Sequence, residues 1–249
     1  MRVSLNFRFM LLLALVWTAV SAHAQNIVTL SGRITNQSTG QGIADVAVVA
    51  VGNQTGTRVV VTDAQGNYSL PFGSNTNIRL RAYKPLHVFN PLLVGYSSVG
   101  GFPISGSITQ DFSGTSFPVP ILIVAFPPIL LTENESLNLL GLDGVLQTRD
   151  PLSSSTTYLG AVDQTRLQLF MVDMELYSGE TLSIISVTGT DAQQVSHTFQ
   201  VEDLRKVPGV PWLSQLTVKV PSDVVGPTEL LVTVTARGQA SNTAKLRVK

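Results

Sequence analysis

The most restrictive feature of this sequence is the recurrence of apolar residues at every second position, in short runs that begin at Ile27. Val28, Leu30 and Ile34 alternate with polar residues near the start, and Leu246 and Val248 do so near the end. Alternation with a period of two places successive side chains on opposite faces of a β-strand. No stretch of ten or more residues carries a convincing helical pattern. We therefore predict an all-β protein.

The spacing of the runs predicts two β-sandwich domains in tandem. Turns rich in Gly, Asn and Ser separate the runs, as is typical of sandwiches. Ile78, Leu80 and Ala82 share one face of their strand, and Arg79, Arg81 and Tyr83 share the other. The predicted organisation is a leader at 1–24, a sandwich at 25–113, a linker at 114–120 and a second sandwich at 121–249.

The end of the chain predicts three strands of a meander. Leu216, Val218 and Val220 form one alternating run, residues 221–227 a turn, and residues 230–234 an answering run. In the first half, a single closing strand is expected from the spacing of Ile104, Ile108 and Phe112. Leu182, Ile184 and Val187 predict a further strand of the second half.

Residues 1–24 have the pattern of a cleavable signal peptide. A basic start with Arg2 and Arg8 precedes an apolar run, and Ala22-His23-Ala24 matches the A-x-A cleavage pattern. The apolar run is shorter than the roughly 20 residues that a spanning helix needs. A second apolar run, 119–131, is also short and contains three prolines. We expect export, and no membrane span in the mature chain.

Composition excludes several classes of function. The chain has no cysteine, which excludes disulfides, thiol catalysis, cysteine zinc ligands and a lipid-modified cysteine after the leader. Removing Arg2 and Arg8 with the leader leaves 14 basic residues against 16 acidic ones. Nucleic acid is not an expected partner, since no basic excess exists to bind phosphate. We expect a protein that is secreted, periplasmic or at the cell surface.

Three segments resemble the carboxypeptidase regulatory-like domain, namely Ser31-Gly32-Arg33-Ile34, residues 40–48 and the Thr-Asp-x-x-Gly-x-Tyr-x-Leu pattern at 62–70. That family is a transthyretin-like β-sandwich, close in shape to the collagen-adhesin B-type repeats of bacterial surface proteins. The likeness departs from the usual pattern after Leu80, where Ala82-Tyr83-Lys84-Pro85 replaces an Ala-x-Gly-Tyr turn.

The last part of the chain is similar to the end of immunoglobulin-like IPT/TIG-type domains of bacterial secreted proteins. The likeness lies in residues 215–221, Gly226-Pro227, residues 232–234 and Ser241-Asn242. Both resemblances imply non-catalytic modules that space, display or bind, in a bacterial protein. They imply no catalytic residue, and an isopeptide crosslink is not expected because the first strand carries Arg33 and no lysine.

No enzyme motif is complete. Residues 95–100, Gly-Tyr-Ser-Ser-Val-Gly, are close to a nucleophile elbow, but Val99 stands where the second glycine belongs. His87 and His197 are the only histidines after the leader, too few for a zinc site without carboxylates. We interpret His197 as a satisfied or surface strand residue and His87 as a loop residue.

Oxygen ligands and paired carboxylates also have plain structural explanations. Asp63, Gln65 and Asn67 offer oxygens at alternate positions, but we predict a hairpin turn there and not a calcium loop. The pairs Glu133/Glu135 and Asp173/Glu175 have a spacing of two, and we interpret them as solvated strand edges. No catalytic site, metal site or cofactor is expected.

Aromatic residues in or beside loops are the best candidates for binding. The segment 84–103, rich in Gly and Pro, is predicted to be a long loop, and such loops usually need a functional reason. Trp212 is interpreted as a core residue more readily than as a platform. The candidate binding residues are Tyr83, His87, Phe89, Tyr96, Phe102 and Trp212.

These observations favour an exported, non-catalytic binding or spacer protein of the bacterial cell envelope or exterior. It would recognise carbohydrate or protein through loops at the end of a sandwich. One alternative is an accessory or weak hydrolase acting on polysaccharide or peptide, which a cleft joining a carboxylate pair or histidine to the 84–103 segment would favour. Another is a structural subunit of an envelope assembly, which an open edge strand would favour. The oligomeric state and the ligand are not predicted.

Overall fold

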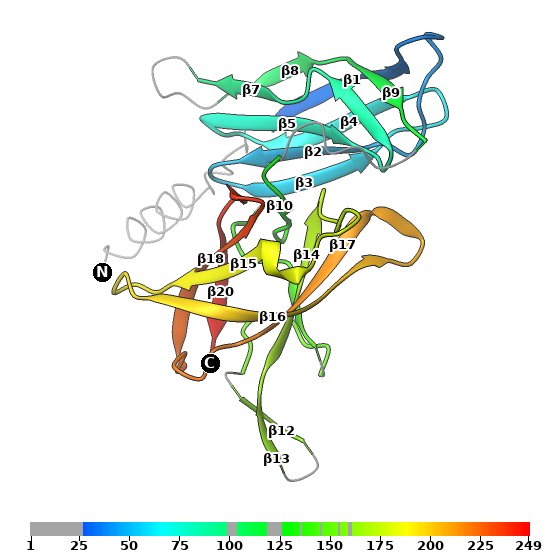
Figure 1. Ribbon diagram of the computed structural model, residues 1–249. Coiled ribbons are helices and arrows are strands. Elements are labelled where there is room, and N and C mark those ends of the chain that lie inside the picture. Colours follow the sequence, from blue (N-terminus) through cyan, green and yellow to red (C-terminus); the bar gives the residue numbers. More distant parts are fainter. Residues whose placement is uncertain are drawn as a thin grey trace, which may run out of the picture.

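The structure, a computed structural model, describes residues 27–98, 104–118, 126–134, 136–144, 146–153, 155–158 and 161–249. In these ranges the chain forms strands and one short 3₁₀ turn, η1 (Leu182–Ile184). No helix among them is long and apolar enough to cross a membrane. The predicted all-β fold with two sandwiches in tandem is confirmed (Figure 1). The predicted leader lies outside the described residues, and the exact division at 114–120 stays a prediction.

The first sandwich has two sheets that face each other. One sheet has the order β4-β1-β9-β6, with β8 also paired to β1, and the other has the order β3-β2-β5-β7. The strands are β1 (Ile27–Asn36), β2 (Ala47–Gly52), β3 (Gly56–Val61), β4 (Asn67–Gly73), β5 (Asn77–Tyr83), β6 (His87–Asn90), β7 (Val94–Ser97), β8 (Gly106–Thr109) and β9 (Phe112–Ser116).

The period-two pattern forms the core of this sandwich. Leu30 of β1 and Leu80 of β5 are fully buried between the sheets, together with Phe72 and Phe112. Each such side chain contributes roughly 1.5–3 kcal/mol of hydrophobic stabilisation. The opposite face of β5 carries Arg79 and Arg81 away from this core, as the sequence predicts.

β1 changes its parallel neighbour halfway along its length. β8 pairs with residues 28–31 and β9 with residues 34–36, so two strands stand where one closing strand was expected. Between them, the backbone N–H of Arg33 donates to the carboxylate of Asp111 at 2.7 Å. The carbonyl of Gln110 comes so close to Gly32 that a Cβ there would lie 1.9 Å from the oxygen. Only glycine fits this close approach.

The turn after β3 connects the two sheets. The prediction of a hairpin is wrong, because β3 and β4 belong to different sheets. The Asp63 carboxylate accepts hydrogen bonds from the backbone N–H groups of Asn67 at 2.8 Å and Gln65 at 2.9 Å. These bonds, that of Asn67 foremost, lower the pKa of Asp63. Its oxygens therefore stabilise the turn, as in an Asx-turn.

The segment 84–103 is not the long loop that the sequence suggests. His87–Asn90 form β6, which pairs with β9, and Val94–Ser97 form β7, which pairs with β5. Each of these strands has only four residues, too few for a sustained period-two run, which is why the pattern missed them. Residues 99–103 lie outside the described part.

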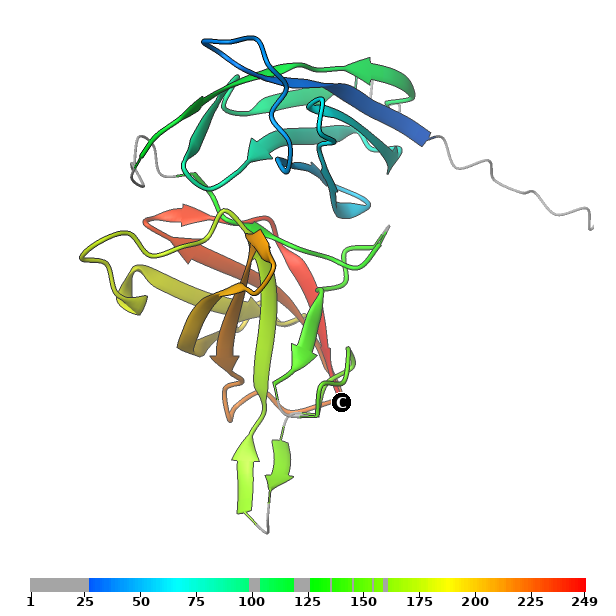
Figure 2. The same ribbon diagram turned by 90° about the vertical axis from the view of Figure 1, so that its right-hand side faces the viewer.

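The second sandwich continues the chain with a nine-stranded sheet of order β10-β14-β17-β16-β15-β18-β19, in which β11 also pairs β14 and β20 pairs β18. β12 and β13 form a separate hairpin that projects away from the first sandwich (Figure 2). The strands are β10 (Ile129–Leu130), β11 (Gly141–Asp143), β12 (Ser155–Tyr158), β13 (Ala161–Gln164), β14 (Arg166–Val172), β15 (Ile185–Thr190), β16 (Ser196–Val207), β17 (Val210–Lys219), β18 (Thr228–Ala236), β19 (Gln239–Ala240) and β20 (Ala244–Val248).

β20 has a hydrogen-bonded neighbour on both sides. On one side it pairs with β18, and on the other it forms parallel bridges at Asn138 and Leu152. The predicted meander is therefore only partly right: β18 pairs with β20, but β17 lies between β14 and β16. The expected strand start at Leu182 is also wrong, since Leu182 and Ile184 lie in η1 and β15 begins at Ile185.

Candidate functional site

An apolar cluster joins the two sandwiches. Val49 of β2 and Tyr83 of β5 meet Ile129, Leu131 and Val172 of the second sandwich, and all five are buried. The half-buried side chains of Phe170 and Trp212 pack against the same cluster. β2 carries apolar residues on both faces, and β5 adds Tyr83 on the face opposite its core, so one face of these strands fills the first core and the other contacts the second sandwich. The junction is therefore a packed interface.

Polar groups of the junction are paired as well. Thr57 of β3 and Thr132 bond reciprocally: each backbone N–H donates to the other hydroxyl, at 2.8 and 2.7 Å. Both threonines are buried. Buried polar groups are stabilising only when paired, so this exchange fixes how the edge of β3 meets the second sandwich.

Arg81 connects the sheet face of β5 to the end of β14. Its guanidinium forms an ion pair with the carboxylate of Asp173 and lies 4.1 Å from the ring centre of Phe126. It also donates to the carbonyl of Pro127 at 3.3 Å. Burial raises the pKa of Asp173, and the charge of Arg81 opposes that rise. The pair is shielded, with 9% and 15% of the two side chains exposed.

A second set of charges surrounds Tyr83. The ammonium of Lys206 on β16 donates to the Tyr83 hydroxyl at 3.1 Å and lies 3.6 Å from the carboxylate of Glu175. Burial lowers the pKa of Lys206 and raises that of Tyr83. The hydroxyl of Tyr83 therefore stays protonated at physiological pH, and the ring serves as a neutral contact for the cation.

Arg237 completes this charged region. Its guanidinium bonds the carboxylate of Glu180 at 2.7 Å and lies 4.4 Å from the ring centre of Tyr177. The hydrogen bond from Arg237 lowers the pKa of Glu180. These contacts fix the segment between β14 and η1 against the end of β18.

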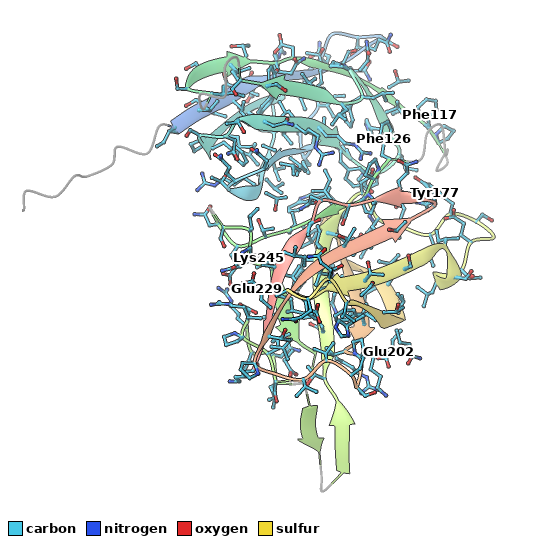
Figure 3. The ribbon with its side chains drawn as sticks, turned by 90° about the vertical axis from the view of Figure 1, so that its left-hand side faces the viewer. Phe117, Phe126, Tyr177, Glu202, Glu229 and Lys245 are labelled. Carbon is cyan, nitrogen blue, oxygen red and sulfur yellow. The ribbon has the colours of Figure 1, made fainter. Side chains whose placement is uncertain are left out.

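Three adjoining pockets form a groove along the junction, which we call the junction groove. The first, its His87 end, has a volume of about 80 Å³ and shares Arg81 and Phe126 with the second. The third, its Arg79 end, has a volume of about 620 Å³ and shares Val51, Arg79 and Asn242 with the second. Figure 3 shows Phe117, Phe126 and Tyr177 gathered where the sandwiches meet. Both sandwiches contribute to each of the three pockets.

Backbone strain is concentrated at the His87 end. Six non-glycine residues in the described ranges have positive φ angles, and three of them, Leu86, Asp173 and Arg237, line this pocket. Such conformations cost of order 1–3 kcal/mol each and tend to cluster at functional sites. The observation supports this region as a candidate site.

The predicted binding residues that the structure describes fall into three groups, and one further residue lies outside its described ranges. Tyr83, His87 and Phe89 all line the His87 end of the groove, although Phe89 is buried and stacks on His87 with ring centres 6.0 Å apart. Trp212 packs in the junction cluster, as its interpretation as a core residue implies. Tyr96 of β7 packs against the first core and donates to the Gln110 side chain at 3.1 Å, apart from the groove. Phe102 lies outside the described residues.

The structure places Asp173, Glu175 and His87 differently from their sequence interpretations. Asp173 and Glu175 follow β14 and are ion-paired and partly buried, so their interpretation as solvated strand edges is wrong. Glu135 lies outside the described residues. His87 lies in β6 and not in a loop, and its Nδ1 contacts the Pro85 carbonyl at 2.9 Å.

His197 of β16 is a satisfied histidine. Its Nδ1 lies 2.9 Å from the carboxylate of Asp223, and its Nε2 lies 3.2 Å from that of Asp191. The hydrogen bond to Asp223, followed by that to Asp191, raises the pKa of His197. No group of three or more metal-ligating residues occurs among the residues that the structure describes.

Several groove residues were not among the sequence candidates, notably Arg79, Arg81, Phe126, Tyr177 and Arg237. The first two had a visible signal, since two arginines alternate on one face of a strand whose other face is apolar. The others come together only because the sandwiches pack against each other, which no local pattern reveals.

Comparisons with known proteins do not assign a function to this site. No known protein family matches the sequence, and no curated protein is similar to it. Among solved structures, the chain is similar to BcpA, the major pilin subunit of Bacillus cereus, with 10% identity over 90% of this chain and 69% of that one and a TM-score of 0.29. A variant of BcpA gives 11% identity, 90% and 70% coverage and a TM-score of 0.28. At this level the likeness does not bear on function.

Proposed function

We propose that this chain is an exported, non-catalytic binding or spacer protein of the bacterial cell envelope or exterior. It recognises carbohydrate or protein in the junction groove. One observation supports the proposal. The groove has walls from both sandwiches, and in it two residues of segment 84–103, His87 and Leu92, lie beside Tyr177 and Arg237. Clefts between domains are preferred positions for ligand sites.

Point variants at the groove test this proposal. Because β6 and β7 are parts of the sheets, replacing the whole 84–103 segment would damage the fold. Leu92→Lys instead places a charge on a groove residue that is 39% exposed, and Val225→Lys is the matched control at 72% exposure outside the groove. Residues 25–249 and both variants are applied to a glycan array and to immobilised envelope extract.

Saturable binding that Leu92→Lys weakens at least tenfold, and Val225→Lys leaves intact, is the expected result. Equal binding by both variants would overturn the groove as the site. A folded chain that binds nothing in either assay would leave the spacer role alone.

A hydrolase is the second candidate, because Asp173, Glu175 and His87 line the same pocket at one end of the groove. A carboxyl with a raised pKa beside a second carboxylate is a recognised arrangement for acid catalysis. Against it, Asp173 is held by Arg81, Glu175 lies beside Lys206, and the pocket holds only about 80 Å³. Release of reducing ends from envelope polysaccharide, lost in both Asp173→Asn and Glu175→Gln, would establish the enzyme.

A structural subunit is the third candidate, since β7 ends the order of its sheet. The backbone N–H of Ser98 donates to the carbonyl of Thr76, so Thr76 and Ser98 form a hydrogen-bonded pair. Such pairs alternate with non-hydrogen-bonded pairs along an antiparallel ladder, so the backbone N–H and C=O groups of Gly95 and Ser97 point away from β5. An added strand could pair there. Gly95→Pro removes a donor from this edge without removing a bond to β5. Envelope crosslinks that disappear in Gly95→Pro would favour the subunit over the binding module.

A further inference from the structure

The Arg79 end of the junction groove differs in charge from the rest of the groove. At the His87 end the cations have partners: Arg81 pairs with Asp173, and Arg237 pairs with Glu180. At the Arg79 end the described lining residues include Arg79 and Lys245 but neither Asp nor Glu. Lys245 lies 3.1 Å from Glu229, and Figure 3 shows these two side chains on the second sandwich.

Arg79 itself is exposed and has no ion pair or hydrogen bond from its side chain to any residue that the structure describes. The side-chain amide of Asn77, two residues earlier on the same face of β5, is likewise exposed and unbonded within the described ranges. These two groups therefore stand side by side as free donors, with the amide oxygen of Asn77 as a free acceptor.

The neighbouring strand leaves them uncovered. In the register of β5 and β7, Gly95 lies opposite Arg79 and Ser97 lies opposite Asn77. A Cβ at Gly95 would meet no heavy atom within 4 Å. Large side chains at positions 95 and 97 would lie over the guanidinium of Arg79 and the amide of Asn77, because directly opposite residues of antiparallel strands are close together. The small residues keep both groups open to a ligand.

The far wall offers polar groups to a ligand, and its charged residue, Lys245, is paired with Glu229. Asn242 uses its amide to bond both backbone groups of Leu130, at 2.9 Å each, so it is a fixed part of the wall. Thr243 adds a hydroxyl from the second sandwich. On the Arg79 side, the Asn53 amide already donates to Thr76 and accepts from the backbone N–H of Asn77. The volume of about 620 Å³ lies in the range of ligand sites.

We propose that the Arg79 end of the groove binds a carboxylate-bearing polysaccharide. The Arg79 guanidinium takes the carboxylate as a bidentate partner, and Asn77 bonds a neighbouring sugar hydroxyl, which can both donate and accept. A guanidinium suits a planar carboxylate by its fork of donors. An acidic peptide is less well matched, because extended peptides are recognised by pockets for alternate side chains, and the apolar contacts here are limited to Val51, Leu137 and Leu231. This inference rests on the proposed recognition function of the groove.

The test compares four soluble polymers by calorimetry with residues 25–249: polygalacturonate, dextran sulfate, dextran and polyglutamate. The variants are Arg79→Gln and, as a matched control, Arg205→Gln, whose side chain is 59% exposed on β16 outside the groove. We expect polygalacturonate to bind, with at least a tenfold loss in Arg79→Gln, no change in Arg205→Gln and weaker binding at high salt.

Each other outcome has a defined meaning. Preference for dextran sulfate would replace the carboxylate by a sulfate, and preference for polyglutamate would replace the sugar by a peptide. Either preference overturns the proposal. Equal affinity for dextran, or an unchanged affinity in Arg79→Gln, overturns it as well. If no polymer binds while envelope extract still distinguishes Leu92→Lys from Val225→Lys, the polysaccharide assignment fails and the recognition function stands.

Discussion

Arg81 and Asp173 form an ion pair between the last part of β5 and the residue that follows β14, and so connect the two sandwiches at the base of the junction groove. Asp173 holds this position at a φ angle of 59°, a conformation that aspartate tolerates better than most residues. The pair places charge in the interface at a site from which water is largely removed, so each partner depends on the other.

Breaking the Arg81–Asp173 pair is expected to destabilise the protein more than breaking an exposed ion pair would. Arg81→Met leaves the Asp173 carboxylate in a buried position without its ion-pair partner, and we expect a loss of about 2–4 kcal/mol in the free energy of unfolding. A double-mutant cycle with Asp173→Asn, followed by urea denaturation, should give a coupling of at least about 1 kcal/mol. The exposed pair Arg205 and Asp203, 3.8 Å apart, is the control and should couple by less than about 0.5 kcal/mol. Equal coupling in both pairs would contradict the account.

His197 should make stability depend on pH. Its pKa is raised by Asp223 and Asp191, so the folded state favours the imidazolium. Its contribution is fully present below the unfolded pKa of about 6.5 and is lost as the pH rises through the higher folded value. His197→Gln should therefore lower stability more at pH 5.5 than at pH 9, measured by urea denaturation at both. The same loss at both pH values would show that the ring acts by packing alone.

Gly32 is expected to tolerate no side chain. Gly32→Ala would place a Cβ 1.9 Å from the Gln110 carbonyl, so β1 or the segment joining β8 to β9 must move. We expect a loss of about 3 kcal/mol or more in unfolding free energy. Gly95→Ala, which meets no atom within 4 Å, is the matched control and should change stability by less than about 0.5 kcal/mol. Similar effects at the two glycines would mean that β1 and Gln110 are farther apart than described.

The threonine exchange at the junction gives a separate test of the interface. Thr132→Val removes the hydroxyl that accepts the Thr57 N–H and leaves that buried donor unpaired. The expected loss is about 1–3 kcal/mol in unfolding free energy. Thr243→Val, at an exposed threonine, should be nearly neutral in the same denaturation experiment. A neutral Thr132→Val would mean that the edge of β3 is hydrated and not packed against the second sandwich.

The fold class could be predicted because it is a local property. Alternation in 28–34 and 78–83 identifies β1 and β5 and even assigns Arg79 and Arg81 to the face opposite the core. Strand pairing is harder to predict from the sequence, because it depends on which strand edges are already paired with other strands. β17 and β18 are consecutive and both alternate, yet β17 is occupied by β14 and β16 and cannot pair with β18.

The candidate site could be predicted only in part, for a similar reason. Tyr83 and His87 were found because aromatic and histidine residues near a Gly- and Pro-rich segment stand out in the sequence. Asp173 and Tyr177 were not, since nothing in residues 173–177 indicates that they will face residues 81–92. Residues 173–177 lie near residues 81–92 because the two sandwiches pack together through Val49 and Val172. That packing depends on the fold of the whole chain.

The absence of cysteine allows the most direct test of the groove as a recognition site, because one introduced thiol can be modified without background reaction. Leu93→Cys places it on a groove residue that is 47% exposed, and Val225→Cys places it outside the groove. Saturable binding to envelope extract is measured before and after reaction with a bulky maleimide. The account predicts that modification abolishes binding by Leu93→Cys and leaves Val225→Cys unaffected. Undiminished binding by the modified Leu93→Cys protein would contradict it.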